Sequence, residues 1–399
     1  MGTSGIQSTS NDQRSGGVDM NNSPTKPDRL RVMTVVGTRP ELIRLAIAIA
    51  KFDEVFDHFL LHTGQNSDPQ LSDVFFDDLA IRKPNAYLGV DNTTLGSQIA
   101  DVVRGTEKYL VEFKPDALVV LGDTNSSMSA IIAKRFGTVV YHLEAGNRSF
   151  DPNVPEEINR RLIDHVADFN LVYSEHARQN LLREGLLPRF VSKTGSPIAE
   201  LAQDLQEKQS SESALETLNL RPQEYFVASL HRQENIDSPD RARQAILTLN
   251  QVARHFGKPI VLSTHPRLKS KLSTLSTDGE SEILFHPPFG FWDYLNLQRN
   301  ALCVLSDSGS VSEESAIFGF KAVTMRDSME RPEALEAGTI SLVGLNAEDV
   351  IRGIEVVMDS GEIPIPDDYL ITDFSSRVVN FILSTSGRRN FWTGLRSKD

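Results

Sequence analysis

The chain has 399 residues, of which 39% are hydrophobic, and its formal net charge is −13. This length usually corresponds to two domains, and the apolar content is enough for sizeable cores. The acidic balance argues against nonspecific binding to nucleic acid or to anionic membranes, because a phosphate backbone is held by an excess of Lys and Arg. A small anionic ligand stays possible, since it needs only a few placed arginines. The sequence contains no run of about 18 apolar residues, so it predicts no membrane-spanning segment.

The single cysteine and the first residues bear on the compartment. Cys303 lies inside an apolar run and has no partner for an internal disulfide, which favours a reducing, cytoplasmic location. Residues 1–28 are rich in Ser, Gly, Asn and Asp and lack the apolar core of a secretory signal. We expect a disordered tail there, with Met20 as an alternative start.

Apolar runs without alternation recur along the chain, as is typical of strands buried on both faces of a parallel sheet. In the first half we expect strands at 31–36, 57–62, 117–121, 138–142, 170–173 and 190–193. Helices are expected between them at 41–52, 97–113, 126–136 and 156–167. After a polar stretch at 203–222, strands are expected again at 225–230, 259–263, 282–286, 301–305, 321–325 and 339–343.

This alternation predicts an α/β fold with two doubly wound, Rossmann-like domains. We assign the first domain to residues 29–200 and the second to 201–370, after the tail at 1–28. A last helix near 371–385, within the segment 371–399, is expected to cross back to the first domain. Ligands of such sheets bind outside the carboxyl ends of the strands. The residues that follow the strands are therefore the candidate site.

The first strand is followed by Gly37-Thr38-Arg39-Pro40-Glu41. The start of the next helix favours an anion, with Arg39 as a second donor. An ordinary turn with a surface arginine explains the same residues equally well. The motif is not Gly-x-Gly-x-x-Gly, so no dinucleotide cofactor is indicated.

Three carboxylates in the first half are candidates for acid–base chemistry. Asp123 and Glu144 come just after buried strands, where a carboxylate is costly unless it is used or paired. Glu156 follows a proline, a placement that a favourable acidic residue in the first helical turn also explains. A cluster of carboxylates allows one to be held protonated and another ionised. The neighbouring arginines at 160 and 161 could instead pair with these acids structurally.

In the second half, Ser308, Gly309 and Ser310 open a helix whose free N–H groups could bind phosphate. Glu314, one turn later, could accept two hydroxyls of a ribose. The alternative is a capping box between Ser310 and Glu313.

His231 begins a polar cluster with Arg232 after a strand, and His265 and Arg331 follow later strands. Each is a candidate for contact with a sugar or a phosphate, whereas a structural histidine or a charged loop is the alternative. The histidines and the cysteine lack the spacing of metal ligands, so no metal site is predicted.

Taken in order, these motifs resemble the non-hydrolysing UDP-N-acetylglucosamine 2-epimerase family. The matching pieces span about residues 31 to 345 and are Gly-Thr-Arg-Pro-Glu, His-Thr-Gly-Gln, Gly-Asp-Thr, Glu-Ala-Gly-x-Arg, Pro-Glu-Glu-x-Asn-Arg, Thr-Gly-Ser-Pro, His-Arg-x-Glu-Asn, Thr-His-Pro-Arg, Asp-Ser-Gly, Glu-Glu and Glu-Arg-Pro-Glu. Any one motif is weak, but the ordered set is specific.

The resemblance implies a GT-B-like fold, with the two domains around a central cleft. It implies a homodimeric enzyme without a cofactor, which inverts C2 of a UDP-linked N-acetylhexosamine by eliminating and readding UDP for cell-surface polysaccharide synthesis. The implied catalytic residues are Asp123, Glu144, Glu156 and His231. The implied substrate-binding residues are Arg39, Arg148, Arg232, His265, Ser308, Gly309, Ser310, Glu314 and Arg331.

Three positions depart from the family pattern: Arg44 replaces lysine, Gln233 replaces arginine, and Asn66 replaces histidine. These departures argue against allosteric regulation by UDP-N-acetylglucosamine. Gly-Asp-Thr-Asn-Ser and Glu-Ala-Gly-Asn-Arg look closer to a branch that converts UDP-2-acetamido-2,6-dideoxy-L-talose to UDP-N-acetyl-L-fucosamine for capsule or O-antigen. A GT-B glycosyltransferase and a nucleotide-sugar sensor without turnover are the two rival functions.

Overall fold

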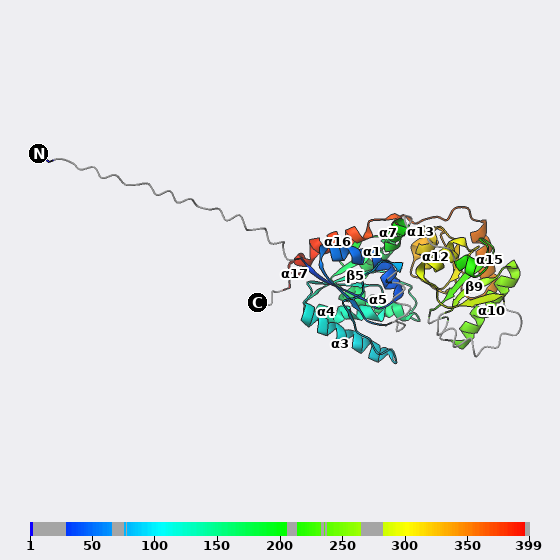
Figure 1. The fold of residues 1–399 in the computed structure, drawn as a ribbon, viewed down its shortest axis with the longest axis horizontal. Helices are drawn as coiled ribbons and strands as arrows, with labels where there is room; N and C mark the ends of the chain where they lie inside the picture. The colour runs from blue at the N-terminus through cyan, green and yellow to red at the C-terminus, as the bar shows by residue number, and fades with distance from the viewer. Residues whose placement is uncertain are drawn as a thin grey trace.

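The computed structural model describes residues 1–2, 29–65, 76, 78–205, 214–232, 235, 238–264 and 282–395. Within these residues two parallel sheets, one in each half of the chain, organise the molecule (Figure 1). The first has the strand order β3-β2-β1-β4-β5-β6-β7, and the second has the order β10-β9-β8-β11-β12-β13. Both orders reverse once, between β1 and β4 and between β8 and β11. These are the topological switch points at which doubly wound sheets bind ligands.

The strands of the first sheet follow the uninterrupted apolar runs of the sequence. They are β1 (Arg31–Val36), β2 (Asp57–His62), β3 (Ala86–Tyr87), β4 (Ala117–Leu121), β5 (Val139–Leu143), β6 (Phe169–Val172) and β7 (Val191–Lys193). Every residue of β4 and β5 is buried, because helices cover both faces of the sheet. The short edge strand β3 was not predicted, since Ala-Tyr forms no apolar run.

Helices pack on both faces of the first sheet. They are α1 (Arg39–Val55), α3 (Leu95–Phe113), η1 (Asn125–Met128), α4 (Ser129–Phe136), α5 (Pro155–Val166), α6 (Glu175–Arg183), η2 (Pro188–Phe190) and α7 (Pro197–Leu205). Val32 and Val36 of β1 pack in one hydrophobic cluster with α1, whereas Met33 and Val35 pack on the opposite face with α3, α4 and α5. The helix predicted at 126–136 is thus divided into a 3-10 turn and α4.

The second domain repeats this plan. Its strands are β8 (Phe226–Leu230), β9 (Ile260–Thr264), β10 (Ile283–His286), β11 (Val304–Ser306), β12 (Ala322–Thr324) and β13 (Ser341–Leu342). Its helices are α8 (Ala214–Thr217), α10 (Pro239–Phe256), α12 (Phe291–Asn300), α13 (Val311–Phe318), α14 (Pro332–Glu336), α15 (Ala347–Asp359) and the 3-10 turn η3 (Asp367–Leu370). Cys303 is fully buried, and burial raises the pKa of its thiol to about 12, which makes it chemically inert.

The C-terminal segment, with α16 (Phe374–Thr385), η4 (Ser386–Arg388) and α17 (Arg389–Thr393), lies on the first domain. α16, in orange-red, runs beside α1 (Figure 1). Phe374, Val378 and Ile382 are buried in the same hydrophobic cluster as Val32. The core of the first domain is therefore completed by the end of the chain.

The predicted fold class is confirmed: an α/β protein with two doubly wound, parallel-sheet domains of the GT-B type. No helix in the described part of the chain is long and apolar enough to cross a membrane. The predicted tail falls almost wholly on residues 3–28, which lie outside the described residues, as does His265.

Candidate active site

The loops after β1 and β4 meet at the first switch point. A Cβ atom on Gly37 would lie 2.0 Å from the Ser126 Oγ and 2.1 Å from the Thr63 Oγ1. Only glycine fits this approach of the β2 and β4 loops to the end of β1. Arg39, the first residue of α1, is half-buried immediately beyond this loop.

Glu41 joins these two loops. Its Oε2 accepts hydrogen bonds from the backbone N–H groups of Gly37 (2.9 Å) and Thr38 (2.7 Å) and from the Thr38 hydroxyl (2.8 Å), while its Oε1 accepts from the Thr124 hydroxyl (3.0 Å). Thr38 and Glu41 thus form a capping box at the start of α1. Burial raises the pKa of Glu41 to about 7, against the lowering effect of these hydrogen bonds.

Asp123 follows β4 and is paired with Arg160 of α5. The Arg160 Nη2 and Nε donate to the Asp123 Oδ2 at 2.5 and 3.1 Å, and the guanidinium is buried. The structural pairing considered from the sequence is therefore present. It keeps the carboxylate at a fixed position on the edge of the site.

Glu144 has an unusual backbone. It follows β5 with a φ of +63°, in the left-handed region that a non-glycine residue rarely adopts. Its Oε1 lies 2.5 Å from the Arg331 Nη2 and 3.6 Å from the Arg44 Nη1. Gly122 faces it, because a Cβ there would lie 3.2 Å from the Glu144 Oε2. Such local strain is frequent at functional sites, where surrounding contacts maintain it.

Glu156 begins α5 and contacts the second domain. Its Oε1 accepts a hydrogen bond from the Arg232 Nη1 at 3.0 Å, whereas its Oε2 is buried with no hydrogen-bond partner among the described residues. An unsatisfied buried carboxylate oxygen is costly in a purely structural residue. The interpretation of Glu156 as only a helix-start residue therefore leaves this oxygen unexplained.

Asp307 organises the second switch point. It accepts hydrogen bonds from the backbone N–H groups of His231 and Arg232 at 3.0–3.2 Å and from the Asn235 side chain at 3.1 Å. The His231 Nδ1 lies 3.2 Å from the Asp307 Oδ1, and the imidazole stays 41% exposed. Asp307 thereby joins the ends of β8 and β11 and leaves His231 open to a ligand.

The Ser308–Ser310 turn opens α13. The Ser308 Oγ accepts from the Ser310 N–H (3.3 Å) and lies 2.9 Å from the Ser310 Oγ. Ser310 is the N-cap, but its side chain caps nothing, and Glu313 points elsewhere, so the capping box considered from the sequence is wrong. A Cβ on Gly309 would lie 2.2 Å from the Glu330 Oε1, so this position too requires glycine. Glu314 is half-buried on the first turn of α13.

Glu330 is a buried counter-ion that the sequence reasoning missed. Its two oxygens accept from the Arg232 Nη2 (3.1 Å) and the Arg326 Nη1 (2.7 Å). Burial would raise the pKa of Glu330, but the charges of Arg232, Arg326, Arg160 and Arg331 hold it well below its usual range. Glu330 therefore stays ionised and fixes the guanidinium of Arg232.

Arg148 takes a structural position. Its Nη1 donates to Asp164 at 2.7 Å, and its Nε and Nη2 donate to the two oxygens of Glu184 at 2.8 and 2.7 Å. The side chain is buried between α5 and α6. These contacts use the guanidinium within the first domain, so they do not support the predicted contact with substrate.

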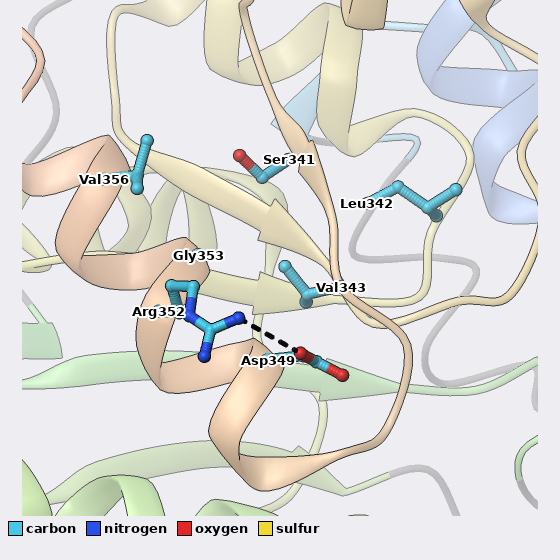
Figure 2. Close-up of a pocket in the computed structure, with 7 residues that line it drawn as sticks. All are labelled: Ser341, Leu342, Val343, Asp349, Arg352, Gly353 and Val356. Carbon is cyan, nitrogen blue, oxygen red and sulfur yellow. Dashed lines mark ion pairs between the residues drawn. The ribbon is translucent and has the colours of Figure 1, made fainter.

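A separate shallow pocket lies on the second domain between β13 and α15. Figure 2 shows its lining, in which Arg352 and Asp349 form an ion pair at 4.0 Å. None of the predicted site residues lines it, and it is not part of the candidate site. Among the described residues, no group of three or more His, Cys, Asp or Glu is arranged to hold a metal ion.

Comparisons with known proteins agree on one family. The family model described as UDP-N-acetylglucosamine 2-epimerase matches residues 49–383. The UDP-N-acetylglucosamine 2-epimerase of Rickettsia bellii is 38% identical in a solved structure, with a TM-score of 0.86 over 92% of this chain and 100% of that one. The Methanocaldococcus jannaschii enzyme, solved with UDP-GlcNAc and UDP, is 32% identical, with a TM-score of 0.82 over 89% of this chain and 100% of that one. The UDP-2,3-diacetamido-2,3-dideoxy-D-glucuronate 2-epimerase of Pseudomonas aeruginosa is 30% identical over 84% of this chain and 95% of its own length.

Proposed function

The chain belongs to the UDP-N-acetylglucosamine 2-epimerase family, and from this premise we propose that it inverts C2 of UDP-N-acetylglucosamine. One observation carries the proposal: each of the three candidate carboxylates lies against an arginine. Arg160 pairs with Asp123, Arg331 with Glu144, and Arg232 with Glu156, as ion pairs of 2.5, 2.5 and 3.0 Å. The candidate acid–base carboxylates and their arginine partners thus lie side by side, and two of the three pairs connect the two domains.

The chemistry explains why both kinds of group are needed. The C2 hydrogen is not adjacent to a carbonyl, so simple removal and return of a proton is implausible. Instead, a base takes the C2 proton, the C–H electron pair forms a C1–C2 double bond, and UDP leaves with the C1–O electron pair. The resulting glycal is protonated at C2 from the opposite face, and the UDP oxygen rejoins C1. Carboxylates serve the two proton transfers, and arginines stabilise the departing diphosphate.

We assign Asp123, Glu144 and Glu156 to proton transfer, and we assign His231, whose imidazole is 41% exposed, to the diphosphate. The Ser308–Ser310 turn at the start of α13, together with Arg39 and Glu314, is assigned to UDP. Peptide N–H groups at a helix start suit phosphate, and a glutamate suits ribose hydroxyls.

Exchange with solvent tests the reaction. In D2O, the enzyme should place deuterium at C2 of both epimers of UDP-N-acetylglucosamine, as followed by proton NMR. Epimerisation without solvent label would contradict the elimination route. Transfer of the sugar to an added acceptor would indicate a glycosyltransferase, and UDP-sugar binding without exchange would indicate a sensor.

The substrate is tested in the same assay with a panel of UDP-sugars. The Pseudomonas aeruginosa relative carries the name of an epimerase for a different UDP-sugar at similar sequence identity. UDP-2-acetamido-2,6-dideoxy-L-talose and a 2,3-diacetamido uronate therefore belong in the panel. If kcat/KM is highest for either of these two UDP-sugars, that sugar replaces UDP-N-acetylglucosamine as the proposed substrate.

We further propose a cytoplasmic homodimer that supplies precursors of cell-surface polysaccharide. The buried free thiol of Cys303 supports a reducing compartment. Ile158 and Leu162, one turn apart on α5, are 58% and 48% exposed and are suited to an apolar contact between subunits. Light scattering coupled to size exclusion should give twice the mass of the chain, and Ile158→Lys should lower that mass.

A further inference from the structure

Glu313 is a fully buried carboxylate near the candidate site, and the only role considered for it from the sequence, a capping box with Ser310, is wrong. It lies on the first turn of α13 and is 0% exposed. Its Oε1 is 2.6 Å from the Arg331 Nε, and its Oε2 is 3.2 Å from the Arg44 Nη1. The Ser196 hydroxyl donates to the same Oε2 at 2.8 Å. Glu313 of the second domain thereby contacts two residues of the opposite half of the molecule.

The two arginines that contact Glu313 also contact Glu144. Arg331 and Arg44 lie 2.5 and 3.6 Å from the Glu144 Oε1. The centroid of the Tyr173 ring lies 5.6 Å from both guanidinium carbons, so the two cations contact the same ring. Two cations are thus shared by two carboxylates, and the formal charges of this four-residue cluster cancel.

We propose that Glu313 is a positioning residue that controls the basicity of Glu144 by sharing Arg44 and Arg331 with it. This inference rests on the proposed function, in which Glu144 transfers a proton at C2. Glu313 itself need not touch the substrate. Its negative charge offsets part of the positive electrostatic potential that both arginines create at the Glu144 carboxylate.

Charge balance gives the direction of the effect. Without the Glu313 charge, Glu144 would be the one carboxylate among the described residues left within 4 Å of the two buried guanidiniums, and the four-residue cluster would carry a net positive charge. Glu330 and Glu333, which also interact with Arg331, form no ion pair with either guanidinium within this distance. Interactions between charges are strong where water is excluded. An added positive charge favours the ionised form of a carboxylate, and a carboxylate that holds its negative charge more tightly is a weaker base. Tyr173 also faces Glu144, and burial raises the pKa of Tyr173 well above its usual value, so its hydroxyl stays neutral.

The experiment is a pH profile of kcat and KM for Glu313→Gln in the C2 exchange assay. We expect kcat to fall about 10- to 100-fold, with KM within a small factor of the wild type, because the lost effect is on proton transfer. The acid limb of the kcat profile should move about one pH unit lower, as expected for a carboxylate that gains an uncompensated cation. Glu313→Asp, which keeps the charge, should retain the position of the wild-type limb.

Glu200→Gln is the matched control, since it removes another internal carboxylate that binds Ser375 and none of the four cluster residues. Its pH profile should match the wild type. If Glu313→Gln lowers activity only in proportion to its content of folded protein and leaves the acid limb in place, Glu313 is merely structural and the inference fails. If Glu313→Gln does not fold, the Asp variant decides, because a displaced acid limb in that variant overturns the proposal and an unmoved one supports it.

Failure of the proposed function gives a different result. In that case the wild type itself would show no exchange at C2. If only the role of Glu144 is wrong, Glu144→Gln would keep near-wild-type exchange, whatever Glu313→Gln does. An inactive Glu144→Gln together with a wild-type pH profile for Glu313→Gln would instead reject only the role of Glu313.

Discussion

Replacing Glu41 with Gln should remove a pH dependence from the stability of the protein. The Oε2 of Glu41 accepts from two backbone N–H groups, which cannot reverse, whereas its Oε1 faces the Thr124 hydroxyl, which can donate or accept. If Oε1 were protonated, it would donate to the Thr124 hydroxyl instead of accepting from it, and no hydrogen bond would be lost. An amide places an N–H at the same position, so Gln reproduces the protonated form of Glu41.

The magnitude follows from the raised pKa. Burial raises the pKa of Glu41 from 4.5 to about 7, and the side chain is 1% exposed. Below pH 4.5 the carboxyl is protonated in both the folded and the unfolded chain. As the pH rises from 4.5 to about 7, only the unfolded chain releases this proton, so the folded state loses relative stability. The difference between the two pKa values corresponds to a free energy of folding of about 3 kcal/mol at most. All of this stabilisation is lost above pH 7.

Unfolding transitions of the wild type and Glu41→Gln, measured from pH 5 to 8, test this reasoning. The two proteins should unfold at similar temperatures at the acidic end, and Gln should become the more stable variant as the pH rises. Glu54→Gln is the control, because Glu54 is an exposed glutamate of the same helix that pairs with Lys51 at the surface. Parallel curves for the wild type and Glu41→Gln would refute a titration of Glu41 near neutral pH.

Three further outcomes are expected. Gly37→Ala should lower the stability by about 1–3 kcal/mol, because its Cβ would overlap the Ser126 hydroxyl; an unchanged melting temperature would contradict the close approach of the two loops. Asp123→Asn and Glu156→Gln should each lower kcat about 10²- to 10⁴-fold with little change in UDP affinity, and wild-type turnover in both would mean that the site is misplaced. Ser308→Ala should weaken UDP binding, measured by calorimetry, more than it slows the bound substrate.

The fold could be predicted because its strands are buried on both faces. Such strands appear in the sequence as uninterrupted apolar runs, and β1 and β2 occupy the predicted ranges. Asp123 and Glu144 were proposed as site residues by the same rule, since each comes just after a buried run. The two-residue strand β3 was missed because an edge pairing this short leaves no pattern of its own.

The partners of the charged residues could not be predicted in this way. Thr38 and Glu41 do show the spacing of a capping box, a local signal that was available. Glu313 shows the same spacing from Ser310, yet its carboxylate turns to Arg44 of the other domain. The two Ser/Thr-x-x-Glu patterns are locally equivalent, but only Thr38 and Glu41 form a cap. The difference lies in the charged residues that tertiary folding brings near each glutamate. Arg148 illustrates the same limit, because it lies in the loop after β5 and its partner Glu184 is the C-cap of α6, 36 residues later.

The arrangement of charges also explains how a chain with a net charge of −13 can bind an anionic nucleotide. Exposed charges farther than about 8 Å from a site are largely screened at physiological salt. The charged residues close to the site therefore determine whether it attracts an anion. Two of the three carboxylate–arginine pairs, Glu144 with Arg331 and Glu156 with Arg232, join the two domains. For these two proposed proton-transfer acids, the nearest positive charge is therefore supplied by the domain proposed to bind UDP. A separation of the domains would part Glu144 from Arg331 and Glu156 from Arg232, so we expect catalysis to require both sheets to be held together.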